Sequence, residues 1–388
     1  MALPFSYNAR NVLVRWKVTL LAIGGIGLVV AVFIFLVAMS AGFRLALRAT
    51  GSPENAILIQ KGSNAELTSG LSREDAQKVI VDDRVARDAQ GRPLASPEVV
   101  IVGVMMRKDP PVDVNVTIRG VSQMAFQVRS GVRIVEGRNF TPGLNEIIVG
   151  RKLQERMQRA NVGDVLRLQK RDWNIVGVFE AEGSGFESEV WGDVDVIAQA
   201  FNRSGSYQSV TMRLKDPSTL EAFARQVDND PALQADLKQE RAFYEAQSEQ
   251  LATGILVLAA FVGIVMGIGA VFGAMNTMYA IVSARTREIG TLRALGFRRW
   301  SVLVSFVAES ILLALAGGVL GCLLALPFNG LTTATGGANF SEVAFAFRIT
   351  PGALVAGLVF ALLMGLAGGL FPAWRAAKLP ITSALREA

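Results

Sequence analysis

The sequence predicts an α-helical membrane protein with four transmembrane helices and an α+β extracytoplasmic domain between helices 1 and 2. Only 19% of the 388 residues are charged, whereas a soluble domain usually carries about a quarter. The missing charges leave four uncharged segments, and each is longer than the roughly 20 residues that a helix needs to cross a bilayer. These segments are Val18–Met39, Gln250–Ala284, Ser310–Ser341 and Ile349–Trp374. Buried helices of soluble proteins rarely sustain such runs, so we interpret all four as membrane spans.

The chain is predicted to divide into nine segments. In order, they are an amphipathic cytoplasmic N-terminal helix at 1–17, transmembrane helix 1 at 18–40, the α+β extracytoplasmic domain at 41–243, a stalk with transmembrane helix 2 at 244–284, a short cytoplasmic helix at 285–299, transmembrane helix 3 at 300–328, an extracytoplasmic loop at 329–348, transmembrane helix 4 at 349–374 and a cytoplasmic tail at 375–388. For the N-terminal segment, a plain polar tail is the alternative to an amphipathic helix.

The first uncharged segment has two interpretations. Arg10, Arg15 and Lys17 precede it and small residues follow it, as in a cleaved signal peptide. The apolar core of a signal is usually about 7–15 residues, which is shorter than this segment. We therefore expect the segment to remain as a membrane anchor.

The basic residues predict the orientation of the chain. Segments 1–17, 285–299 and 375–388 carry 11 Lys or Arg residues and two acidic residues, whereas 40–250 carries 27 basic and 29 acidic residues. Basic residues near the spans mark the cytoplasmic side, so both termini should be cytoplasmic and the large domain should lie on the opposite side of the membrane. A nucleic-acid surface would gather these charges in one patch, and we expect no nucleic-acid partner.

Two absences from the sequence exclude some kinds of site. There is no histidine, which removes the commonest zinc ligand and the commonest general base, and we expect no metal site. The single cysteine, Cys322, lies in an apolar span, so no intrachain disulfide is possible.

The segment between the first two spans alternates β-like runs with helical patterns. Strands are predicted at Ala56–Gln60, Val99–Val104, Val114–Arg119, Glu146–Val149, Val165–Leu168, Asn174–Phe179 and Val210–Leu214. Helices are predicted at Ser72–Val81, Lys152–Ala160 and Ser218–Val227, and the first has Ser72 as its N-cap. The acidic, glycine-rich stretch Glu180–Asp193 is expected to be an exposed loop. Mixed elements over about 200 residues predict an α+β domain with two subdomains.

The second span is too long for a bilayer alone. It runs from Gln250 to Ala284, and the polar heptad Tyr244–Gln250 before it contains no Gly or Pro, so we expect one continuous helix that projects past the membrane surface. Small residues let helices approach closely in lipid. The glycines at this spacing are expected to pack helices together, within the bundle or across a dimer interface: Gly263, Gly267, Gly269, Gly273, Gly317 and Gly321, with Gly365 and Gly369 in the fourth span.

A short basic stretch joins the second and third spans. In SARTREIGTLRALGFRRW, residues 283–300, Ile289, Leu292 and Leu295 recur at helical spacing among five arginines, and Gly296 is placed as a helix stop. The stretch predicts a short amphipathic helix at the cytoplasmic membrane surface. A basic loop that only fixes topology is the alternative, but such a loop needs no apolar stripe.

These residues resemble the signature of MacB/FtsX-like ABC transporter permeases. The resemblance lies in Arg285-Thr286-Arg287-Glu288-Ile289-Gly290, in the following Leu292–Gly296 and in Pro372–Ala377 with Ala384–Arg386. Within the domain, Glu136–Phe140, Ile148–Gly150 and Val176–Val178 are similar to the MacB-type periplasmic core. The resemblance covers most of the chain and is loosest between residues 50 and 130.

The resemblance implies a permease subunit that is not itself an enzyme. Its cytoplasmic helix would dock on a separate ABC ATPase subunit, present in two copies, which would bind ATP and Mg²⁺; no G-x-x-x-x-G-K-[ST] phosphate loop occurs here, so no cofactor is expected on this chain. The residues that would bind the ATPase are Arg285, Thr286, Arg287, Glu288, Ile289, Leu292, Arg293, Leu295 and Phe297. The resemblance also implies other partners: a second permease copy or a paralogue, membrane lipids, and a periplasmic adaptor with an outer-membrane channel.

Three functions remain open at this point. The family implies mechanotransmission, in which ATP hydrolysis moves the periplasmic domain to export or extract a substrate. A LolC/LolE-like lipoprotein-releasing permease is the first alternative, and FtsX-like signalling to a cell-wall hydrolase is the second. An intramembrane enzyme that uses Glu309 lacks a second catalytic group, and we expect Glu309 to lie near the headgroups or to pair with a nearby arginine.

Overall fold

The computed structural model describes residues 16–336 and 342–380, and the chain divides into two compact units. We call Gly42–Ala252 with Thr332–Ala346 the sheet unit, and the residues up to Ala41, Thr253–Leu331 and those from Phe347 onward the helical unit. Each unit is described by itself.

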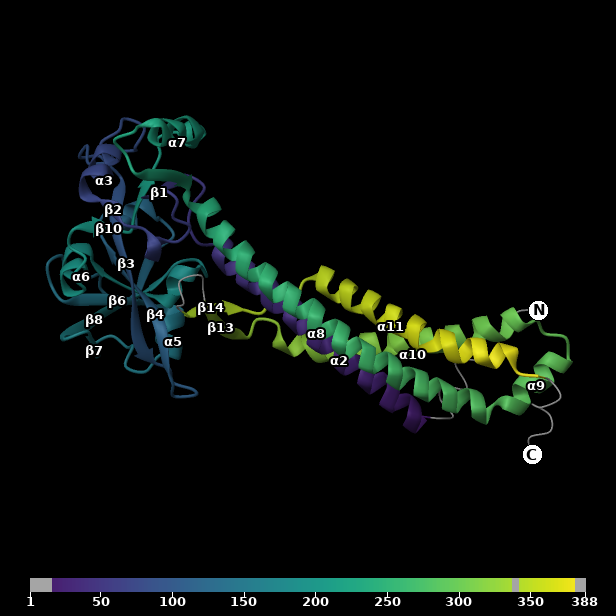
Figure 1. Ribbon diagram of the computed structural model, residues 1–388. Coiled ribbons are helices and arrows are strands. Elements are labelled where there is room, and N and C mark those ends of the chain that lie inside the picture. Colours follow the sequence, from purple (N-terminus) through teal and green to yellow (C-terminus); the bar gives the residue numbers. More distant parts are fainter. Residues whose placement is uncertain (1–15, 337–341, 381–388) are drawn as a thin grey trace. The chain divides into compact units, whose positions relative to one another are not determined.

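The sheet unit is built on one large mixed sheet (Figure 1). Among the described residues it has ten strands, in the order β12-β1-β11-β3-β4-β9-β6-β8-β5, with β7 paired to β8. Most pairs are antiparallel, but β4 pairs with β9 and β6 with β8 in parallel. The strands are β1 (Asn55–Gln60), β3 (Ala95–Met106), β4 (Asp113–Val121), β5 (Arg133–Gly137), β6 (Glu146–Gly150), β7 (Val165–Leu168), β8 (Arg171–Glu180), β9 (Glu189–Asp193), β11 (Ser209–Arg213) and β12 (Ala235–Gln239); β2 (Leu71–Ser72) and β10 (Ser206–Tyr207) form a small separate pair.

Short helices cover this sheet and complete its apolar cores. They are α3 (Arg73–Ile80), α4 (Ala125–Val128), α5 (Arg151–Arg156), α6 (Val194–Ala200) and α7 (Leu220–Asn229), with single 3₁₀ turns at Glu66–Thr68, Gly185–Ser188 and Pro217–Thr219. Side chains of α3 and α7 pack with β1, β11 and β12 in one core, and those of α5 and α6 pack around Trp173 in another. The predicted N-cap is confirmed, because the Ser72 hydroxyl accepts from the backbone N–H of Asp75.

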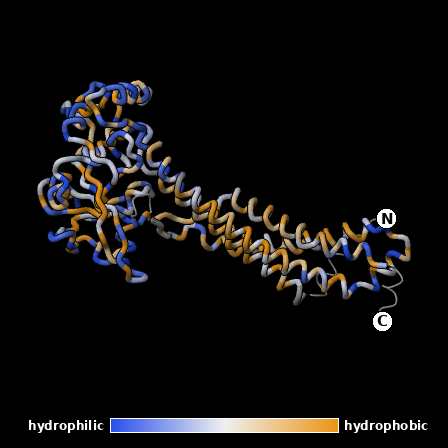
Figure 2. The backbone as a smooth tube through the Cα atoms, in the orientation of Figure 1, coloured by the Kyte–Doolittle hydropathy of each residue, from blue (hydrophilic) through white to orange (hydrophobic). Residues whose placement is uncertain are grey.

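The helical unit contains the membrane-length helices. Within the described residues, four helices are long and apolar enough to cross a bilayer: α2 (Trp16–Arg48), α8 (Glu240–Ala284), α10 (Arg299–Ala325) and α11 (Pro351–Lys378). Their apolar residues form long hydrophobic stretches in Figure 2. The short helix α9 (Thr286–Ala294) joins α8 to α10, and a 3₁₀ turn, Leu326–Phe328, follows α10.

The described spans approach one another closely at several glycines. A Cβ at Gly321 of α10 would lie 2.7 Å from the carbonyl oxygen of Gly27 on α2, and one at Gly317 would lie 2.9 Å from Ile26. A Cβ at Gly369 of α11 would lie 1.9 Å from the Ser310 hydroxyl of α10. Without a hydrophobic force between helices in lipid, such close approach supplies the van der Waals contact that holds the bundle together.

The continuous second span is confirmed, while some other boundaries shift. α8 is one helix of 45 residues that already begins at Glu240. α2 does not end at 40, because Ala41–Arg48 contains strong helix formers and the helix runs through Gly42. Gly42 is required there, since a Cβ would lie 2.0 Å from the carbonyl oxygen of Ala346. The predicted helix at Lys152–Ala160 is shorter, ending at Arg156, and the N-terminal helix at 1–17 falls almost entirely outside the described residues.

Two segments expected to be loops are ordered parts of the sheet unit. The loop predicted at 329–348 contains the hairpin of β13 (Thr332–Gly336) and β14 (Glu342–Ala346). Glu342 of this hairpin lies 3.3 Å from Arg107 and 3.0 Å from Arg156. The Ser188 hydroxyl accepts from the backbone N–H of Ala344.

Glu180–Asp193 was wrongly expected to be an exposed loop. Most of its residues from Ser184 onward are buried, in a 3₁₀ turn and the central strand β9. Hydrogen-bond donors and a lysine stabilise the buried carboxylate of Glu187. It accepts from the backbone N–H groups of Ala181 and Gly183, at 2.9 and 2.8 Å, and lies 3.4 Å from Lys152.

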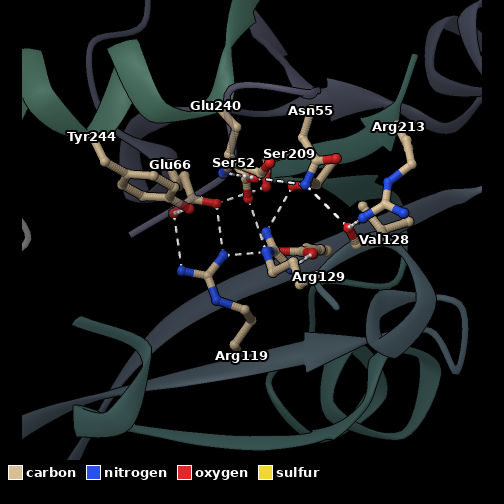
Figure 3. A network of polar contacts seen from close by, with 12 residues as sticks. Ser52, Asn55, Glu66, Arg119, Val128, Arg129, Ser209, Arg213, Glu240 and Tyr244 are labelled. Carbon is tan, nitrogen blue, oxygen red and sulfur yellow. Dashed lines mark hydrogen bonds and ion pairs between the residues drawn. The ribbon is translucent and has the colours of Figure 1, made fainter. Parts of the chain in front are cut away.

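A buried network of charges occupies the centre of the sheet unit (Figure 3). Arg119 of β4 binds three carboxylates at once. Its guanidinium nitrogens lie 2.7 and 3.0 Å from the two oxygens of Glu66, 2.7 and 2.9 Å from those of Glu189, and 2.8 Å from Glu98. Arg119 is 1% exposed, so these contacts are shielded from water.

A second arginine extends the network to the start of α8. Arg129, which follows α4, binds Glu98 through two nitrogens and donates from Nε to Glu240 at 2.8 Å. Glu240 is the first residue of α8, and its other oxygen accepts from the Ser52 backbone and the Asn55 amide, each at 2.9 Å. Glu98 therefore bridges the two arginines, and we call Glu240–Tyr244 the foot of α8.

The network carries more negative than positive charge. Each of the eight carboxylate oxygens of its four glutamates accepts a hydrogen bond, including one from the Tyr244 hydroxyl to Glu66. Burial alone would raise the pKa of Glu66, but the charge and hydrogen bonds of Arg119 outweigh it and lower that pKa. Arg119 therefore stabilises the charged form of the buried Glu66 carboxylate.

Replacing Arg129 should test the importance of this network. Arg129→Met leaves Glu240 without a countercharge in the interior and removes one of the two arginines that bind Glu98, and such a loss typically costs about 3–5 kcal/mol. The midpoint of urea unfolding, followed by tryptophan fluorescence, should fall accordingly. Arg44→Met is the matched control, because the Arg44–Glu249 pair is partly exposed and such pairs contribute under about 1 kcal/mol. Equal midpoints for the two variants would contradict the assignment.

Replacing Gly321 should test the packing of the bundle. In Gly321→Val the side chain must push α2 and α10 apart, and overpacking typically costs about 1–3 kcal/mol. The thermal unfolding midpoint in detergent should drop for this variant. Gly254→Val of α8 is the control, because nothing lies within 4 Å of the Cβ it would add, and its midpoint should stay at the wild-type value. A similar drop in both variants would mean that close packing at Gly321 is not the cause.

Candidate functional site

The candidate site is the junction of α8, α9 and α10. One residue, Arg285, separates the end of α8 from the start of α9, and its φ of −115° and ψ of 15° turn the chain between the two helices. The predicted helix stop is also present, since Gly296 has a φ of +94°. The backbone N–H groups of Gly296 and Phe297 bond back to the carbonyls of Arg293 and Leu292, as expected of a glycine C-cap.

Arg285 makes contacts inside the junction. Its Nη1 lies 3.0 Å from a carboxylate oxygen of Glu309 on α10, and its Nε lies 3.0 Å from a carboxylate oxygen of Glu288 on α9. The guanidinium also lies 5.1 Å from the ring centre of Phe306. Both Arg285 and Glu309 are buried. The expectation that Glu309 pairs with a nearby arginine is thus confirmed.

Three further predicted site residues contact other parts of the helical unit. Arg293 donates to the carbonyl oxygen of Ala377 at 2.8 Å, which places a cation at the C-terminal end of α11, where the helix dipole favours it. Ile289 is buried in an apolar cluster with Met278, Val302 and Phe306. The Thr286 hydroxyl bonds to the backbone of α8, at the Ser283 carbonyl.

The remaining residues leave a surface for contact with another molecule. Leu295 is 72% exposed, and Arg287 and Glu288 are exposed on α9, while Leu292 and Phe297 are half-buried. Three residues outside the predicted set extend this surface: Arg298, Arg299 and Trp300, the last also 72% exposed. A large aromatic side chain among arginines is a composition enriched at protein interfaces, and that signal was readable in the sequence.

The glycines predicted for packing fall into two groups. Gly317 and Gly321 pack against α2, and Cβ atoms at Gly263 and Gly267 of α8 would meet Phe33 and Phe360. In contrast, nothing lies within 4 Å of a Cβ at Gly269 or Gly273. These two glycines line a groove of about 450 Å³ between α8 and α2, which also includes Gly25 and Met266.

The chain matches two sequence profiles that together cover most of its length. Residues 19–230 match the MacB-like periplasmic core domain, and residues 260–381 match the FtsX-like permease C-terminal region.

Relatives with these domains include ABC transporter proteins. The macrolide export ATP-binding/permease protein MacB of Bordetella avium (strain 197N) is 26% identical over 95% of this chain, which spans 58% of the relative's length. The uncharacterized ABC transporter permease YknZ of Bacillus subtilis (strain 168) is 25% identical over 71% of this chain and 70% of its own length.

A solved structure of the periplasmic region of MacB from Actinobacillus actinomycetemcomitans matches 54% of this chain and 95% of its own, at 12% identity and a TM-score of 0.37. A TM-score this low carries no weight, and the assignment rests on the sequence profiles. The profiles agree with the four membrane-length helices and with a mixed α/β domain between the first two of them. The chain belongs to the MacB/FtsX-like family of ABC transporter permeases.

Proposed function

We propose that this chain is the permease subunit of a MacB-like ABC transporter that works by mechanotransmission. A separate ATPase subunit, in two copies, binds ATP and Mg²⁺ and docks on α9 from the cytoplasm. Its closure moves α9, and α8 transmits that movement to the sheet unit in the periplasm, which exports or extracts a substrate. Both termini are cytoplasmic in this arrangement, and the protein resides in the inner membrane.

The uninterrupted α8 is the observation that supports this proposal most directly. Its 45 residues extend about 67 Å at roughly 1.5 Å per residue, more than twice the thickness of a hydrocarbon core of about 30 Å. The foot is held by Arg129 through Glu240, and the other end adjoins Arg285, which is paired with Glu309. A helix held at both ends by buried ion pairs is suited to carry force along its axis.

The exposed part of the junction is the proposed docking surface. Of the predicted contact residues, Arg287, Glu288 and Leu295 are exposed, and Glu288 is also paired with Arg285. Arg285, Ile289 and Arg293 hold the junction together. We add Trp300 to the contact set because of its exposure.

The open glycines of α8 support a second copy or a paralogue as a further partner. Gly269 and Gly273 face unfilled space in a segment that would lie within the bilayer, where small residues admit another helix. A periplasmic adaptor and an outer-membrane channel complete the proposed assembly.

Docking is tested by placing a charge on the exposed surface of α9. Leu295→Asp should lower the amount of ABC ATPase that co-purifies with the full chain in mild detergent by roughly 30-fold, which corresponds to about 2 kcal/mol, the loss typical of a central interface residue. Leu144→Asp, at a half-exposed leucine of the sheet unit, is the matched control and should leave recovery unchanged. Full recovery with Leu295→Asp would argue against docking on α9.

Transmission is tested by interrupting α8. Thr253→Pro removes a backbone hydrogen bond and kinks a helix interior at a cost of about 3 kcal/mol or more. The ATPase should still associate, but ATP should no longer change hydrogen exchange in the sheet unit. Thr253→Ala, at the same exposed position, should respond like the wild type. If ATP still changed hydrogen exchange in the sheet unit of the proline variant, the proposed transmission along α8 would be contradicted.

A further inference from the structure

The buried ion pair of Arg285 and Glu309 is the most unusual feature of the helical unit. Glu309 is 2% exposed in the middle of α10, among residues that would lie at or within the membrane. Ionisable groups at such depths are costly and rare, and they usually have a function.

Stability alone does not account for this pair. Replacing a buried ion pair by apolar side chains of similar volume is often neutral or stabilising, so a pair that only filled space would gain nothing from its charges. Arg285 also has a second ionic contact, to Glu288, whose side chain is 55% exposed. The same guanidinium therefore contacts one carboxylate inside the bundle and one on the surface of α9.

We propose that Arg285 is a positioning residue that connects the exposed surface of α9 to α10 through Glu288 and Glu309. The inference rests on the proposed docking at α9 and deepens it. A partner that displaces α9 then acts on two spans: on α8 through the adjoining backbone, and on α10 through the two carboxylates held by Arg285.

The geometry requires arginine at this position. Its planar fork presents Nε and Nη1 in fixed directions, and each reaches a different carboxylate at 3.0 Å. A lysine would keep the charge but concentrates it at one freely rotating ammonium, which does not reproduce the fork. Phe306 lies beside the guanidinium and further restricts its orientation.

The decisive variant removes the charges but keeps the volume. Arg285→Met with Glu309→Leu should fold normally, since no unpaired charge is left buried. Arg285→Lys keeps the positive charge and tests whether the two-directional geometry of the guanidinium is needed. Arg293→Met is the matched control, because Arg293 also bonds from α9 to the bundle, but to a backbone carbonyl of α11.

The first measurement uses the permease alone in lipid nanodiscs. In a Cys322→Ala background, spin labels at Thr291→Cys of α9 and Val304→Cys of α10, both exposed positions, report the distance between the helices. The distribution should be narrow in the wild type and in Arg293→Met, and at least twice as wide in the apolar pair and in Arg285→Lys. A narrow distribution in the apolar pair would overturn the positioning role.

The second measurement adds the co-purified ATPase. The apolar pair should bind the ATPase within about twofold of the wild type, while the ATP-dependent change in hydrogen exchange of the sheet unit falls at least tenfold. A full response in the apolar pair would also overturn the inference. If the wild-type chain recruits no ATPase, the proposed function fails, and the distance measurement still decides whether Arg285 positions α9.

Discussion

The buried contact between Arg129 and Glu240 is the interaction on which the proposed transmission along α8 depends. It joins the first residue of a 45-residue helix to the centre of a mixed sheet, in a place from which water is excluded. Because Arg129 shares Glu98 with Arg119, a movement of the foot of α8 would disturb several buried charges at once. Polar networks of this kind are either fully satisfied or very costly, so the foot has no intermediate positions of low energy.

The junction at the C-terminal end of α8 also contains a buried ion pair, between Arg285 and Glu309. Arg285 and Arg293 make contacts within the chain, whereas Leu295, just after the end of α9, and Trp300, at the start of α10, are exposed. In the proposed mechanism, a docking element held by buried contacts passes on a displacement without deforming. Arg285 precedes α9 and Arg293 lies in its last turn, whereas Arg287 is exposed on the same helix.

Local patterns allowed part of this structure to be predicted. The continuity of α8 follows from its length and from the absence of Gly and Pro in Tyr244–Gln250. The start of α3 follows from the N-cap Ser72, and the end of α9 follows from Gly296. Each of these features depends on residues that lie close together in the sequence. The pairing of Glu309 with an arginine was also expected, because a carboxylate in a span requires a partner.

The central network could not be predicted in the same way. Its contacts join residues separated by 53 positions, as for Glu66 and Arg119, or by 111, as for Arg129 and Glu240. A single sequence holds no record of such pairings, and acidic residues are normally exposed. For that reason Glu180–Asp193 was wrongly interpreted as a surface loop, although Glu189 belongs to the network.

The β13–β14 hairpin has a consequence for how the protein is made. Its strands come from residues 332–346, yet they belong to a unit whose other residues, 42–252, leave the ribosome much earlier. Glu342 reaches Arg107 and Arg156 only after α10 has been synthesised. The sheet unit is therefore completed only when residues that follow α10 in the chain have been synthesised.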